Sequence, residues 1–82
     1  MSVGEMCFLQ PVGRRLNEKD LRHILALARV FKGVAVYMVS CEVLFLVAGC
    51  GSRYELVKDG DIEEFEGFEG FRKRLEGVCV DE

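Results

Sequence analysis

The sequence predicts an α+β fold: a two-layer domain with a four-stranded mixed sheet and two helices. Residues 34–39 and 43–48 are short runs rich in β-branched and aromatic side chains, which is typical of strands. Residues 18–32 combine a helical apolar stripe with capping residues at both ends. These observations predict a single domain over residues 1–82 with the element order β-α-β-β-β-α.

The first predicted strand covers residues 5–12 and ends near Pro11, because proline cannot donate a hydrogen bond to a neighbouring strand. Residues 13–15 are predicted to form a loop. A strand followed by a helix and another strand usually makes a right-handed crossover. We therefore expect the first two strands to run parallel.

The first helix is predicted over residues 18–32. Asn17 is a favourable N-cap, and Asp20 stands at the third helical position, where an acidic side chain completes a capping box. Gly33 is the expected stop signal. The residues with helical spacing that form its apolar stripe are Leu21, Ile24, Leu25, Ala28 and Phe31.

The two central strands are apolar on both faces. A membrane helix is not favoured, because residues 34–49 fall short of the roughly 20 residues that a span needs. Glu42 in the middle of the stretch also opposes insertion. We expect instead a β-hairpin with Cys41 and Glu42 in its turn, and no membrane partner.

The C-terminal third is predicted to contain one strand and one helix. Residues 53–58 alternate polar and apolar side chains, as in an edge strand that completes an antiparallel meander. Residues 59–61 read as a turn. Residues 61–77 have a mostly helical pattern, but Gly67 and Gly70 disfavour a regular helix before about residue 68. Residues 78–80 could form a short strand or a packed tail.

The apolar residues on both faces of the central strands predict an interface. If both helices cover one face of the sheet, the other apolar face is bare, and a homodimer or a small heterocomplex would cover it. The alternative is a monomer with one helix on each face. The predicted interface residues are Val34, Val36, Met38, Val43, Phe45 and Val47. The opposite faces of the same strands provide the alternative set, Ala35, Tyr37, Val39, Leu44, Leu46 and Ala48.

The charge distribution suggests a second function, nucleic-acid binding. The chain has a net charge of −3, yet residues 14–32 hold six basic and two acidic side chains. A basic first helix could contact phosphates. Its polar face has no interleaved aromatic residue and the chain as a whole is acidic, so this function is not favoured. The basic residues that would serve it are Arg14, Arg15, Lys19, Arg22 and Arg29.

The four cysteines show no metal-binding or redox spacing. None forms a Cys-x-x-Cys pair, and His23 is the only histidine, so no metal site is expected. Disulfides from Cys79 to Cys7 or to Cys50 are open, but burial of Cys7 and Cys79 as free thiols is favoured. The N-terminus lacks a signal-peptide pattern, so we expect a cytoplasmic location. The scarcity of Asn and Gln beside many charged residues suggests a thermophile.

No catalytic motif stands out, and neither an enzymatic activity nor a cofactor is predicted. The sequence lacks a recognisable pairing of a general acid with a general base. Cys50 and Arg53, in a glycine-rich connection, are a third possibility as a thiol or small-ligand site. The leading hypothesis is a small non-enzymatic protein-interaction module that self-associates through an apolar sheet face.

Overall fold

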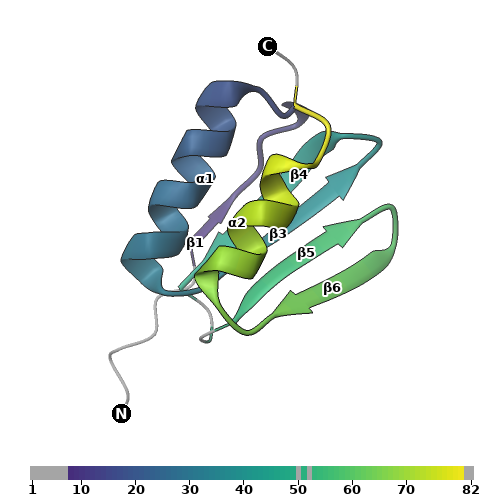
Figure 1. The fold of residues 1–82 in the computed structure, drawn as a ribbon. Helices are drawn as coiled ribbons and strands as arrows, with labels where there is room; N and C mark the ends of the chain where they lie inside the picture. The colour runs from purple at the N-terminus through teal and green to yellow at the C-terminus, as the bar shows by residue number, and fades with distance from the viewer. Residues whose placement is uncertain (1–7, 50, 52, 81–82) are drawn as a thin grey trace.

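The computed structural model describes residues 8–49, 51 and 53–80, and it shows an α+β fold with a mixed sheet and two helices (Figure 1). The sheet of the described residues has six strands rather than the predicted four. The element order is β-β-α-β-β-β-β-α. The elements are β1 (Phe8–Gln10), β2 (Arg14–Arg15), α1 (Glu18–Phe31), β3 (Val34–Val39), β4 (Glu42–Ala48), β5 (Tyr54–Lys58), β6 (Asp61–Phe65) and α2 (Phe68–Glu76).

The strand order differs from the prediction. It is β1-β4-β3-β5-β6, and β2 also pairs with β4. β1 and β3 run parallel, as the crossover through α1 predicts, but β4 lies between them and pairs antiparallel with both. β5 pairs parallel with β3 instead of continuing a meander beside β4. The predicted edge strand is therefore internal, and β6 forms the edge.

Helix α1 confirms the predicted capping box. The Asp20 N–H donates to Asn17 Oδ1 at 2.8 Å, and the Asn17 N–H donates to Asp20 Oδ2 at 3.3 Å. The helix begins at Glu18 as predicted and ends at Phe31. The left-handed residue at its end is Lys32, with φ 58°, and not Gly33.

The segment after β5 was predicted incorrectly in its first part. Residues 61–65 form strand β6, and only Phe68–Glu76 is helical, which agrees with the expected start of regular helix near residue 68. The reason is the turn at Asp59 and Gly60, whose φ values of 52° and 91° suit a type I′ hairpin. This turn folds residues 61–65 back onto β5. Residues 78–80 are a packed tail, with Val78 buried in the core.

Both helices lie on the same face of the sheet (Figure 1). Ile24 and Ala28 of α1, together with Phe71 and Leu75 of α2, are buried against the covered face. The sheet residues buried beneath the helices are Val34, Val36, Met38, Val43, Leu46, Ala48 and Leu56. No element of the described chain covers the other face.

Candidate interaction surface

The uncovered face has an apolar centre that crosses four strands. Phe45 of β4 is aligned with Tyr37 of β3, which is aligned with Val57 of β5 and then with Ile62 of β6. Phe45 is 44% exposed and Ile62 is 64% exposed, while Tyr37 and Val57 are half-buried. The rings of Tyr37 and Phe45 meet edge to face, with centroids 6.5 Å apart. This row is the middle of a continuous apolar surface.

Further apolar side chains extend this surface along the strands. Leu9 of β1, Val47 of β4 and Ala35 of β3 are aligned in the row nearest the start of β3. Val39, at the other end of β3, is 48% exposed, and Leu9 is 57% exposed. We call this side of the sheet the open face and define it by its apolar residues. They are Leu9, Ala35, Tyr37, Val39, Phe45, Val47, Val57 and Ile62.

A β-bulge in β4 determines which side chains reach the open face. Tyr37 pairs with Phe45, but the next residue, Met38, pairs with Val43, so Leu44 is an extra residue in β4. Val43 and Leu46 are three residues apart, yet both are buried under the helices. Strict alternation would have placed Val43 on the same side as Phe45.

The bulge and the positions of the helices divide the predicted interface residues between the two faces. Val34, Val36, Met38 and Val43 lie in the core of their own chain, so they are not available to a partner. Phe45 and Val47 lie on the open face. Of the alternative set, Ala35, Tyr37 and Val39 lie on the open face, Leu46 and Ala48 are in the core, and Leu44 is half-buried at the bulge.

Charged residues lie at two corners of the open face. At one corner, Glu55 of β5 is directly opposite Glu64 of β6, and Glu64 accepts a hydrogen bond from Arg53 at 3.0 Å. At the other corner, Arg15 of β2 is aligned with Glu42 of β4. The sequence offered no signal for this arrangement, because it depends on which strands are neighbours.

The basic residues of the predicted nucleic-acid surface do not form one patch. Arg14 is bound to Asp20 at 2.7 Å, which raises the pKa of the Arg14 guanidinium, and Arg22 is bound to Glu18 at 2.6 Å. Arg29 stacks over the ring of Phe68, with 5.3 Å between the guanidinium carbon and the ring centroid. Lys19 is exposed on α1, and Arg15 belongs to the corner of the open face. Phosphate contacts would thus compete with existing ion pairs.

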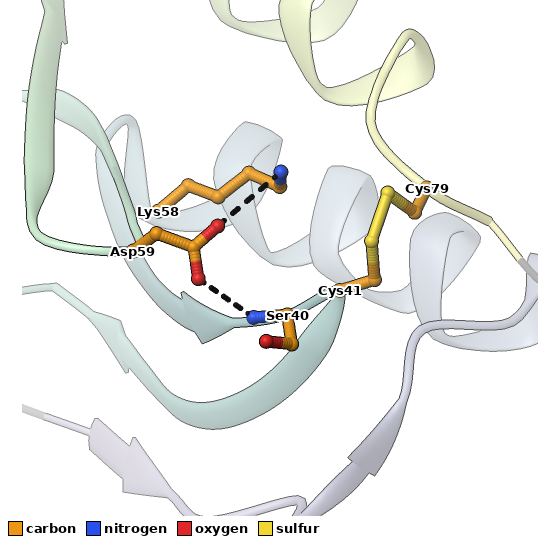
Figure 2. Close-up of a disulfide and its surroundings, with 5 residues drawn as sticks. All are labelled: Ser40, Cys41, Lys58, Asp59 and Cys79. Atoms are coloured by element: carbon orange, nitrogen blue, oxygen red, sulfur yellow. Dashed lines mark hydrogen bonds and ion pairs between the residues drawn. A yellow bond between two sulfur atoms is a disulfide. The ribbon is translucent and has the colours of Figure 1, made fainter.

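A disulfide joins Cys41 to Cys79, a pairing that the sequence did not suggest (Figure 2). Cys79 is therefore not a free buried thiol, and Cys7 and Cys50 lie outside the described residues. The β3–β4 turn consists of Ser40 and Cys41, both with positive φ, so Glu42 begins β4 instead of occupying the turn. The Asp59 carboxylate steadies this turn by accepting from the Ser40 N–H at 2.8 Å.

The described residues assemble no metal centre, and Cys50 of the possible thiol site lies outside them. No group of three or more His, Cys, Asp or Glu side chains among the described residues could hold a metal ion. Arg53, the described half of the possible thiol site, is exposed and bound to Glu64. A cavity of about 100 Å³ beside α1 is bordered by His23, but the Arg14 and Asp20 side chains at its rim satisfy each other.

Comparison of the chain with known protein families, with curated proteins and with solved structures found no match. Neither helix in the described part of the chain is long and apolar enough to cross a membrane. The open face is consequently the feature that the structure offers for a functional argument.

Proposed function

We propose that this protein is a small non-enzymatic interaction module that self-associates through the open face. The observation that supports the proposal is the one-sided coverage of an apolar sheet: both helices pack on one face, and large apolar side chains remain exposed on the other. Exposed apolar patches of this kind usually mark interaction surfaces. A two-fold dimer is the commonest way in which soluble proteins bury such a patch.

The size of the open face indicates a weak dimer. Five strands spaced about 4.8 Å apart, with roughly five residues each, cover roughly 400 Å² in projection. Two such surfaces give about 800 Å² in total, which is below the usual range for stable complexes and typical of weak, transient ones. We therefore expect a monomer–dimer equilibrium that depends on protein concentration.

The test is the mass in solution by light scattering after size exclusion, over a range of protein concentrations. The wild-type chain of 9.3 kDa is expected to approach twice its mass at high concentration, with and without a reductant. Ile62→Glu places a charge on the open face and is expected to remain a monomer. Val30→Glu is the matched control, because Val30 is 72% exposed on α1, away from the open face.

Three results would contradict the proposal. One is a wild-type monomer at every concentration. Another is a dimer that disappears on reduction while the chain stays folded, which would indicate an intermolecular disulfide. The third is an equal effect of Ile62→Glu and Val30→Glu, which would place the contact elsewhere.

A further inference from the structure

Two half-buried carboxylates on the side of the open face, Glu42 and Glu55, have no side-chain partner among the described residues. Arg15 lies directly opposite Glu42, whereas no cation lies opposite Glu55. Glu55 is half-buried between Ala35 of β3 and Glu64 of β6, and its carboxylate has no hydrogen bond or ion pair with another described residue. Its neighbour Glu64 has the same charge and is bound to Arg53. Covering an unpaired carboxylate with apolar surface is unfavourable. A molecule that covers the open face should therefore bring a cation to Glu55.

Arg15 can provide that cation from a second copy of the chain. Arg14 turns toward α1, where it binds Asp20, so the next residue along β2 projects to the opposite side of the sheet. Arg15 is exposed and aligned with Glu42, whose own neighbour in β3 is Val39 of the open face. Arg15 already has an interaction within its own chain. This does not prevent a second one, since Arg72 of this protein binds both Glu69 and Glu76.

Arg15 and Glu55 lie at opposite corners of the open face. Three strand spacings separate β2 from β5, which is about 14 Å, and four residues separate their rows, which is about 13 Å. The midpoint of this diagonal falls between Phe45 and Tyr37, the edge-to-face aromatic pair. A two-fold axis that runs above this pair, parallel to the sheet and perpendicular to the diagonal, exchanges the two corners.

We propose that two copies stack their open faces around this axis, so that Arg15 of each copy binds Glu55 of the other. The proposal rests on the proposed function and adds a specific arrangement to it. Because the diagonal runs at about 45° to the strands, the strands of the two sheets cross at about 90°, which is one of the two common classes of sheet packing. The aromatic pairs of both copies meet at the centre, between two symmetric ion pairs.

The experiment uses charge reversal and mixing. Arg15→Glu alone creates two Glu–Glu contacts in a homodimer, and Glu55→Arg alone creates two Arg–Arg contacts. Each is expected to weaken dimerisation about tenfold or more. In an equimolar mixture of the two variants, a heterodimer has two restored ion pairs, and its dissociation constant is expected to return to within about threefold of the wild-type value. Arg22→Glu, on the outside of α1, is the control and should leave dimerisation unchanged.

The outcomes separate this arrangement from the proposed function. If Ile62→Glu prevents dimerisation but neither charge reversal weakens it, the open face is the interface and the orthogonal arrangement is wrong. If both reversals weaken the dimer and the mixture does not recover, Arg15 and Glu55 do not contact each other. A wild-type monomer at all concentrations contradicts both proposals. Thermal unfolding of each variant shows whether its chain is folded before the mixture is interpreted.

Discussion

The two faces of the sheet are similar in sequence and different in environment. Along β3, the covered face carries Val34, Val36 and Met38, and the open face carries Ala35, Tyr37 and Val39. The first three are at most 2% exposed, whereas Val39 is nearly half exposed. The difference arises from the helices, whose apolar stripes meet only one side. An apolar strand face therefore indicates that a cover is needed, but it does not identify the cover.

Their polar residues also distinguish the two faces. The described core contains no buried polar or charged side chain. The open face has an apolar centre with Arg15, Glu42, Glu55 and Glu64 around it. An apolar centre with a polar rim is the usual anatomy of a reversible interface, in contrast to a permanently buried core. The covered face thus contributes to folding, and we propose that the open face contributes to association.

Replacing one phenylalanine on each side should give the largest contrast between the faces. Phe71 is fully buried, and its ring lies 5.5 Å from that of Tyr54 and 5.9 Å from that of Phe65, measured between centroids. Phe71→Ala is expected to reduce the free energy of unfolding by about 3–5 kcal/mol because it leaves a cavity. Phe45→Ala on the open face should cost about 1 kcal/mol in the monomer.

Urea unfolding at low protein concentration measures both values. Low concentration is needed because self-association would add its own stability to the wild-type chain. Similar losses for the two variants would mean that the open face is already packed within the monomer.

The disulfide links the helical layer to the sheet. Cys79 follows α2, and Cys41 lies at the tip of the β3–β4 hairpin, 38 residues earlier. Removing the bond with Cys41→Ser and Cys79→Ser together is expected to lower the free energy of unfolding by about 2–4 kcal/mol. Urea unfolding of the two single variants is the control, since either change removes the whole bond and should cost as much as both. Additive losses from the single variants would contradict this.

Local signals in the sequence predicted local structure well. The capping box of Asn17 and Asp20 and the stripe of α1 are contained within a few turns of one helix, so they can be recognised without the rest of the fold. The α+β class and the start of regular helix near Phe68 followed from similar short-range patterns. The three-residue spacing of Ile62 and Phe65 led to the wrong prediction of a helix there, because this spacing also occurs on a helix. The adjacent type I′ turn favours a strand instead.

The features that depend on long-range pairing could not be predicted. The insertion of β4 between β1 and β3, the Cys41–Cys79 bond and the placement of Arg15 and Glu55 at opposite corners all require knowledge of which strands are neighbours. The division of the interface residues required one further fact, the bulge at Leu44, because a single extra residue reverses the faces of everything beyond it. The sequence indicated that a second apolar face of the sheet needs a cover, but it did not indicate which residues lie on that face.

We expect the smallest effect from removing an ion pair on the solvent side of α2, far from both faces of the sheet. Arg72 donates hydrogen bonds to the Glu69 carboxylate, the shortest at 2.7 Å, and these bonds together with the positive charge lower the pKa of Glu69. Because the pKa is lower in the folded chain, the pair stabilises the fold above the ordinary pKa of glutamate, and this contribution is lost as the pH falls through the lowered value. Arg72→Gln should raise the pKa of Glu69, as measured by an NMR titration of its side-chain carboxyl carbon. Arg74→Gln, which removes the partner of Glu63 from the same helix, is the control and should leave the Glu69 titration unchanged. An unchanged Glu69 titration in Arg72→Gln would show that the pair is not formed in solution.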